Sequence, residues 1–284
     1  MAHARLRRTS PIAQHAVGAA LEALGTDAAP VGNGSLRLGI VLCVMAGCVN
    51  YSRRFYDETL KDPSTASPVI FPETVFNSPA SHLAALLGTT AINYTLVGDP
   101  GVFLQGIALG ADWLLSERVD GCLVVGAEEI DWLTTEAFQL FDRRGAVSEG
   151  AGALYLRREP HSGSVIRLEA VTQAHSFSKR QTRAQAAQRA RTEIGDAGPK
   201  SLLCDGLQGV PRLDRAEEAA WRDWTGARLS LKMVLGEGLM AAAAWQCVAA
   251  IDALQQSGYT TATVSVVGCN QQAIAARFVR EDQT

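Results

Sequence analysis

The sequence of 284 residues is long enough to bury a large core, either as one domain or as two fused halves. Apolar residues make up 47% and charged residues 19% of the chain, a globular balance that argues against long disordered segments. The formal net charge of −3 argues against the broad basic surface of a nucleic-acid-binding protein. The longest apolar run, residues 39–49, is too short to cross a bilayer, and no apolar segment follows the N-terminal arginines as in a secretion signal.

The cysteine pattern favours reduced, buried thiols over a disulfide framework or a CxxC metal site. The six cysteines lie far apart and mostly inside apolar stretches, at Cys43, Cys48, Cys122, Cys204, Cys247 and Cys269. The sequence also contains no HxxxH, P-loop or GxGxxG motif. We therefore expect a cytoplasmic protein without a metal or cofactor.

Apolar periodicity predicts helices and strands in alternation along the first part of the chain. A helix is expected over residues 11–24, with Ser10 as its N-cap and Pro11 at its first position. The continuous apolar run at 36–44 predicts a buried strand. Further along we expect a helix at 74–87 ended by Gly88, a strand at 94–97, a turn at 98–101 into a helix reaching about 116, and strands at 120–126, 151–157 and 164–171.

The second part of the chain repeats the alternation. A basic stretch at 175–191 is expected to be helical although it lacks a clear apolar stripe. The remaining predicted elements are a strand at 201–204, an acidic helix at 212–224, an Ala-rich helix at 239–256, and strands at 261–267 and 273–279. This order predicts an α/β fold with mainly parallel or mixed sheets.

Several short segments occur in a fixed order along this pattern. Residues 149–154 (EGAGAL) follow residues 126–129 (GAEE), and their glycines allow a close backbone approach or a bulge where a strand begins. The other segments are FPETVFN at 71–77, SHLA at 81–84, LQGI at 104–107, SLK at 230–232, Gly236, and the alanines at 241–244. Together, and in register from about residue 11 to 279, they resemble the β-ketoacyl synthases, condensing enzymes of the thiolase-like superfamily.

The resemblance implies a layered α-β-α-β-α fold and, as is usual in this family, a dimer. We expect a single thiolase-like domain over residues 1–284, with pseudo-equivalent halves at about 1–160 and 161–284. The chain is truncated relative to full-length ketosynthases, because a first strand is missing before the helix at 11–24 and the second half is short.

The family's catalytic cysteine, by this resemblance, is absent. Such enzymes place a cysteine at a sharp turn that opens a buried helix, where the helix N-terminus lowers the thiol pKa and nearby amides form an oxyanion hole. That turn corresponds to residues 97–102, with Pro100 at the thiol position, and the sequence has no cysteine between Cys48 and Cys122. A proline has no nucleophilic side chain but suits the start of a helix. Pro100 is therefore expected to be structural.

The two histidines that support decarboxylation in this family are absent as well. All five histidines of the chain precede residue 176, whereas both family positions lie later, one at Asp205 or Gly206 and the other at Glu237. An ionised carboxylate cannot donate a hydrogen bond to an enolate and repels a developing oxyanion. Lys232 matches the family's lysine, and we expect it to form an ion pair with Glu237 or Asp205. Residues 268–273 replace the usual Gly- and Phe-rich gating loop.

Other candidate residues remain open. Cys269, in the loop that matches a segment near the family's active site, is the thiol best placed to act as a substitute nucleophile, although a buried inert thiol is more common. Asp205 and Glu237 could form a new acid–base pair if they converge, since paired carboxylates shift each other's pKa. His82 follows Ser81 on a predicted helix, and this adjacency does not provide a catalytic triad.

A basic run is the candidate contact for acyl carrier proteins, the acidic partners of this family. It comprises Lys179, Arg180, Arg183, Arg189 and Arg191, and no acidic residue interrupts it. A solvated helix face is the simpler interpretation of such a run.

Three functions are consistent with these observations. The first is a ketosynthase-like subunit without the Cys-His-His site, which pairs with an active β-ketoacyl synthase, or with itself, in the manner of the chain length factors of type II polyketide or fatty-acid systems. The second is an acyltransferase or acyl hydrolase with a rebuilt site around Asp205, Glu237 and Cys269. The third is a stand-alone protein that binds acyl chains or carrier protein.

Overall fold

The computed structural model describes residues 4–140, 143, 145–159, 165–198, 200–256 and 258–281. The expected boundary between the halves, at 160/161, lies outside the described residues. Within the described part of the chain, no helix combines the length and the apolar character needed to cross a membrane.

The first sheet has four strands in the order β2-β1-β3-β4. These strands are β1 (Leu38–Val44), β2 (Ile92–Val97), β3 (Gly121–Glu128) and β4 (Gly150–Arg157). β1 pairs in parallel with β2 and β3, and β4 runs antiparallel to β3. Every residue of β1 and β3 is buried, because both faces of these two strands are covered. β2 lies at the edge of this sheet.

The second sheet has six strands. They are β5 (Val165–Val171), β6 (His175–Ser176), β7 (Ser201–Asp205), β8 (Ala227–Ser230), β9 (Thr261–Val267) and β10 (Gln272–Glu281). The order is β5-β10-β9-β7-β8, and the short β6 pairs with β10. β7 pairs in parallel with β8 and β9, whereas β10 is antiparallel to β5 and β9.

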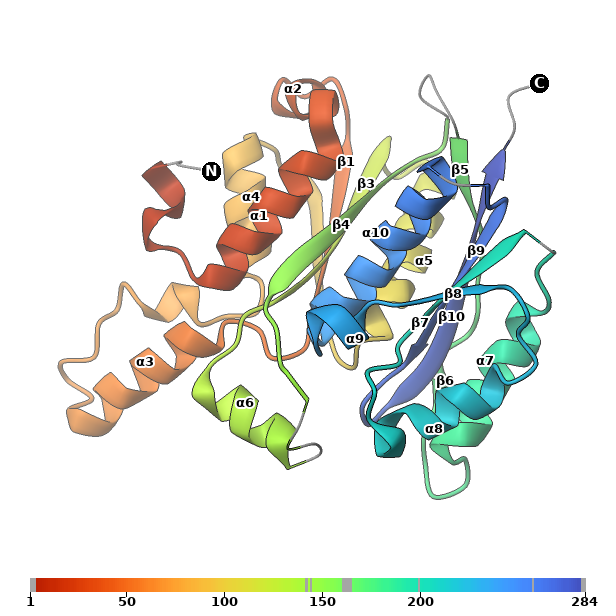
Figure 1. The fold of residues 1–284 in the computed structure, drawn as a ribbon. Helices are drawn as coiled ribbons and strands as arrows, with labels where there is room; N and C mark the ends of the chain where they lie inside the picture. Colours follow the sequence, from red (N-terminus) through yellow and green to blue (C-terminus); the bar gives the residue numbers. More distant parts are fainter. Residues whose placement is uncertain are drawn as a thin grey trace.

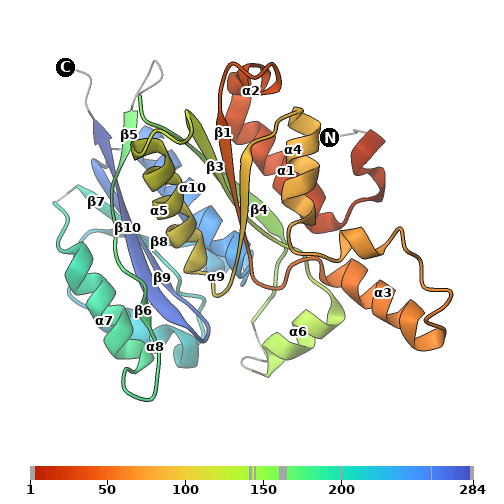
Figure 2. The same ribbon diagram turned by 180° about the vertical axis from the view of Figure 1, so that it is seen from behind.

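Helices cover both sheets and separate them. α5 (Val102–Leu115) and α10 (Met240–Gln256) lie between the two sheets (Figure 1), and their buried residues share one apolar core with strands of both. α1 (Pro11–Leu24) and α4 (Ser78–Leu87) cover the outer face of the first sheet, as the view from behind also shows (Figure 2). α7 (Arg183–Ile194) and α8 (Pro211–Ala220) cover the outer face of the second. The result is the α-β-α-β-α arrangement that the resemblance implies.

The shorter elements and two helices at the periphery complete the chain. The short elements are η1 (Ala4–Arg8), η2 (Gly25–Asp27), α2 (Ala28–Gly32), η3 (Phe71–Glu73) and α9 (Lys232–Leu235). The sequence alone did not predict α3 (Val49–Lys61) and α6 (Trp132–Gln139). α3 buries none of its residues and most of them are polar or charged, so it lacks the apolar composition by which the other helices were predicted. The helix expected at 175–191 begins only at Arg183, and the acidic helix ends at Ala220.

Small residues allow the central helices to approach the first sheet closely. A Cβ added to Gly126 or to Gly152 would lie 2.9 Å from the Cβ of Ala244, and one added to Gly106 would lie 2.7 Å from the sulfur of Cys43. The Ala-rich sequence of α10 is therefore a packing requirement, since a larger side chain would meet strand backbone.

Replacing Ala244 by leucine should test this requirement. Ala244 is fully buried, so we expect the overpacked variant to lose about 1–3 kcal/mol of unfolding free energy or to fail to fold. Urea denaturation followed by circular dichroism measures the loss. Val248→Leu is the matched control, because Val248 is exposed on the same helix, and equal losses in both variants would contradict the argument.

Candidate functional site

The turn between β2 and α5 contains the expected nucleophile position. Pro100 is buried there, and Gly101 is the N-cap residue of α5. Backbone bonds set up the first turn of the helix, from the Val102 N–H to the Asp99 carbonyl (2.8 Å) and from the Phe103 N–H to the Pro100 carbonyl (3.1 Å). The residues of this turn, at 98–101, carry neither a thiol nor a hydroxyl group.

Asp99 connects this turn to the 268–272 loop, which joins β9 to β10. Its side chain is fully buried, and its carboxyl oxygens accept hydrogen bonds from the N–H groups of Cys269 (2.9 Å), Gln271 (3.2 Å) and Gln272 (3.2 Å). The structure thus places the Pro100 turn against the loop that the sequence analysis associates with gating. Sequence reasoning did not single out Asp99, because Gly98-Asp99-Pro100-Gly101 also has the composition of an ordinary surface turn.

Lys232 and Glu237 form the ion pair that was one of the two predicted. The Lys232 ammonium lies 2.6 Å from a Glu237 carboxylate oxygen, and both residues are buried. The other Glu237 oxygen accepts the Leu239 N–H at 2.8 Å. Burial acts to lower the pKa of Lys232, but the charge and hydrogen bond of Glu237, together with smaller contributions from other neighbouring groups, outweigh it and the pKa is raised. Lys232 therefore stays charged and paired.

Asp205 belongs to a different group of contacts at the end of β7. Its carboxylate accepts the Ser230 hydroxyl (2.6 Å) and the Leu207 N–H (3.3 Å), with the Arg228 guanidinium at 3.5 Å. Burial raises its pKa. Its hydrogen-bond and ion-pair partners are thus distinct from those of Glu237, so the structure gives no contact for the acid–base pair considered above.

Glu217 on α8 is the carboxyl group that neighbours Asp205, and sequence reasoning missed it. One Glu217 oxygen accepts the Gly206 N–H at 3.1 Å, and the other accepts the Ser265 hydroxyl. Burial, together with the charge of Asp205, raises the pKa of Glu217 to about 7. A glutamate inside an acidic, surface-like helix sequence gives no signal that it will point inward.

Cys269 does not have the properties of a reactive thiol. It is partly exposed, but burial of the thiol and then the charge of Glu237 raise its pKa to about 12. The thiolate is the nucleophilic form, so the thiol is almost wholly unreactive at neutral pH. The other five cysteines are buried, and burial raises the pKa of each of their thiols.

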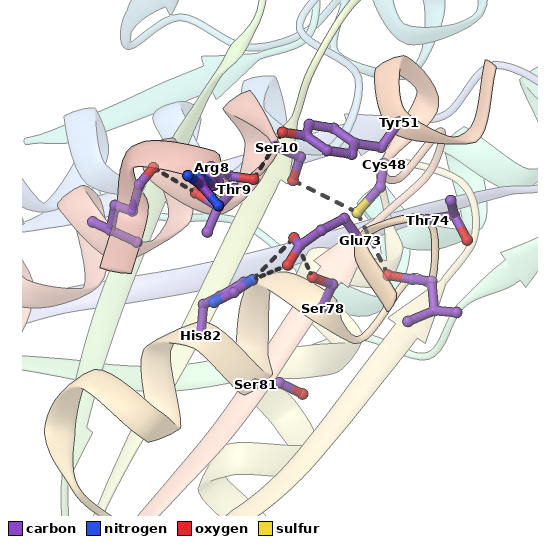
Figure 3. Close-up of polar contacts among 12 residues, drawn as sticks. Arg8, Thr9, Ser10, Cys48, Tyr51, Glu73, Thr74, Ser78, Ser81 and His82 are labelled. Carbon is purple, nitrogen blue, oxygen red and sulfur yellow. Dashed lines mark hydrogen bonds and ion pairs between the residues drawn. The ribbon is translucent and has the colours of Figure 1, made fainter. Parts of the chain in front are cut away.

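His82 on α4 contacts Glu73 of η3, the short helix that precedes α4 in the chain. Its Nε2 lies 2.8 and 2.9 Å from the two carboxylate oxygens of Glu73, and the Ser78 hydroxyl donates to the same carboxylate at 3.0 Å (Figure 3). Ser81 donates instead to the Asn77 carbonyl. Cys48 lies nearby, and its thiol donates to the Val75 carbonyl. These contacts join η3 to α4 and do not form a nucleophile–histidine pair.

The basic run divides into exposed and buried residues. Lys179, Arg180 and Arg189 are exposed, whereas half-buried Arg183 donates to the Val267 carbonyl. Including Arg191 in a docking face is wrong, because its side chain is buried.

Two kinds of contact account for the burial of Arg191. Its guanidinium pairs with Asp196 and Asp223 and stacks 4.7 Å from the centre of the Trp221 ring. Arg191 therefore stabilises the packing of α7 against α8.

The fold is shared with solved ketosynthase structures. No protein-family model matches the sequence, and no curated protein is similar to it. One similar structure is the ishigamide ketosynthase/chain length factor, with a TM-score of 0.82, 18% identity, and coverage of 99% of this chain and 83% of that one. The chain has the ketosynthase fold.

Two further structures share this ketosynthase fold. A ketosynthase in complex with its chain length factor from Xenorhabdus doucetiae gives a TM-score of 0.74 at 15% identity, covering 96% of this chain and 84% of that one. A type II polyketide synthase acyl-carrier protein in complex with its ketosynthase gives 0.78 at 16% identity, covering 98% and 84%. The matched chains are longer than this one, in agreement with the expected truncation.

Glu217 provides a pH-dependent test of the buried carboxyl groups. Its pKa is about 7 in the folded chain and about 4.5 when unfolded, so the native state binds the extra proton between these values. Stability from this group is full below about pH 4.5 and is lost as the pH rises through about 7, by up to roughly 3 kcal/mol. Glu217→Gln should remove the part of the decline in unfolding free energy that Glu217 causes. The measurement is the difference between the wild-type and variant unfolding free energies from pH 5 to 8. The exposed neighbour Glu218 is the control, because Glu218→Gln should leave the slope unchanged; an unchanged slope in Glu217→Gln would contradict the assignment.

Proposed function

We propose that this chain is a ketosynthase-like subunit without condensing activity of its own, which pairs with an active β-ketoacyl synthase in the cytoplasm. In this role it would act as a chain length factor does in polyketide or fatty-acid biosynthesis. The observation that carries the proposal is the turn at 98–101, where a ketosynthase-like framework holds a buried proline and a buried aspartate in place of a nucleophile.

The environment of the other family positions supports the same function. Glu237 is paired with Lys232, and Asp205 is bonded to Ser230 and Leu207. Neither carboxylate can donate a hydrogen bond to an enolate while ionised. The residues that replace the histidines therefore stabilise the fold around the site and do not supply the donors that decarboxylation requires.

The surface near β2 supports pairing with another ketosynthase-like chain. β2 is an edge strand among the described strands, and its Tyr94 and Val97 are 48% and 51% exposed. Large apolar side chains are also exposed just before α4, at Phe71, Val75 and Phe76. An open strand edge flanked by apolar groups is an aggregation hazard unless a partner covers it. A second ketosynthase-like subunit could bury this strand edge and these apolar side chains in an interface.

A carrier protein is the second partner that we propose. Lys179, Arg180 and Arg189 remain exposed after folding and offer positive charge to an acidic protein. One of the similar structures is itself an acyl-carrier protein bound to its ketosynthase.

Intact-protein mass spectrometry tests the proposed lack of catalysis. The purified chain, incubated alone with acyl- and malonyl-carrier protein, should show no mass shift, because its turn has no nucleophile and its Cys269 thiol stays protonated. A stoichiometric acyl adduct would contradict the proposal, and mapping it would identify the nucleophile. An active ketosynthase serves as the positive control for acyl transfer.

A single charge on β2 should test the pairing surface. Val97→Asp places a carboxylate on the exposed strand, and we expect it to weaken association with a co-expressed ketosynthase by at least about tenfold. Size-exclusion chromatography with light scattering measures the complex. Leu115→Asp is the control, since Leu115 is 76% exposed at the C-terminal end of α5. Normal pairing by the Val97 variant would place the interface elsewhere.

A further inference from the structure

Three backbone N–H groups converge on one buried carboxyl group in this molecule. Cys269, Gln271 and Gln272 all donate to Asp99, at 2.9, 3.2 and 3.2 Å. Successive amides that point to a common centre form an anion-binding cavity, and catalytic sites use such donors to hold the oxygen of an acyl group. In this chain the amide cluster is already filled by the Asp99 carboxyl group, whose Oδ1 accepts the Cys269 N–H and whose Oδ2 accepts the N–H groups of Gln271 and Gln272.

The fit between Asp99 and the 268–272 loop leaves no room for a second occupant. A Cβ on Gly268 would lie 1.6 Å from an Asp99 carboxyl oxygen, so only glycine fits at this position. The Asp99 side chain is also fully buried, which keeps water and ligands away from it.

The contacts run in both directions between the turn and the loop. The Asp99 N–H donates to the Gln271 side-chain oxygen at 3.2 Å, and the Gln272 side-chain amide donates to the Gln105 side chain on α5 at 3.1 Å. Asp99 follows β2 of the first sheet, whereas the loop joins β9 to β10 of the second. The bonds therefore tie the two sheets together at the N-terminus of α5.

We propose that Asp99 is a positioning residue that holds the 268–272 loop closed by supplying, from within the chain, the acceptor oxygens that this amide cluster would otherwise take from an acyl substrate. The reference to an acyl substrate rests on the proposed function. The closed loop itself rests only on the contacts described above, and it can be tested on the isolated chain without any partner.

Hydrogen–deuterium exchange of the peptide that contains residues 268–272 tests this proposal. Asp99→Ala removes both acceptor oxygens, so exchange of the three amides should become at least about tenfold faster. Glu129→Ala is the matched control, because Glu129 is an equally buried carboxylate that accepts the N–H groups of Ile12 and Asn50 instead. It should leave the 268–272 peptide unchanged.

Adding sodium acetate to the Asp99→Ala variant distinguishes the loss of these contacts from a general destabilisation of the fold. In Asp99→Ala the added carboxylate should enter the vacated cluster and slow the exchange towards the wild-type rate, whereas sodium chloride at equal ionic strength should not. Acetate should have no effect on this peptide in the wild type. Unchanged exchange in Asp99→Ala, equal acceleration in Glu129→Ala, or acetate acting no better than chloride would each overturn the proposal.

Asp99→Asn covers the case in which the alanine variant does not fold. It keeps the shape of the side chain but replaces one acceptor oxygen with a donor group, which faces an N–H without a partner. Exchange of at least one of the three amides should accelerate, and wild-type protection of all three would overturn the proposal. If this proposal fails, the proposed function is still judged separately by the tests of acyl transfer and pairing.

Discussion

Buried carboxyl groups that accept backbone N–H donors hold much of this chain in place. Among the described residues nine acidic side chains are buried, against two basic ones, Arg191 and Lys232. Four of the nine pair with an arginine or lysine side chain. The other five carboxyl groups accept backbone N–H donors. Glu128 accepts the N–H groups of Met45 and Ala46, and Asp214 accepts those of Gln208 and Val210. A buried polar group is stable only with such partners, so each of these loops must stay in its observed conformation.

The two-sheet arrangement makes these hydrogen bonds between carboxyl groups and backbone N–H groups necessary. α5 and α10 fill a layer so thin that Gly106 and Gly110 pack directly against the sulfur atoms of Cys43 and Cys122 on the first sheet. Strand ends from both sheets meet around the N-termini of these helices, and their connecting loops cannot all run through solvent. Loops that are enclosed need internal acceptors for their N–H groups, and carboxylates at the strand ends provide them.

The framework could be predicted from the sequence because its signals are local. The apolar runs of β1 and β3, the alanines of α10 and the capping pattern of α1 each identify an element without knowledge of its neighbours. α3 could not be found in this way, because it buries none of its residues.

The site was less predictable, because its contacts join residues far apart in the sequence. The Lys232–Glu237 pair spans five residues and was among the expected pairings. Asp99 and Cys269 are 170 residues apart, and nothing local distinguishes this buried aspartate from one in a surface turn. Similarly, Glu217 lies in a helix with four other charged residues, which is typical of a solvent-facing helix.

The same substitution of partners explains both parts of the altered site. At the turn that the resemblance assigns to the nucleophile, the carboxyl oxygens of Asp99 accept three backbone N–H groups that, under the proposed function, could otherwise face an acyl carbonyl. The positions that the resemblance assigns to the two histidines are Asp205 or Gly206 and Glu237, and the carboxylates of Asp205 and Glu237 are each bonded to their own neighbours. An acyl carbonyl is itself an acceptor, so it finds competing acceptors in place of free donors at each of these points. Under the proposed function these internal bonds make the subunit rigid at its centre, and its contribution to a partner's reaction comes from the surfaces around β2.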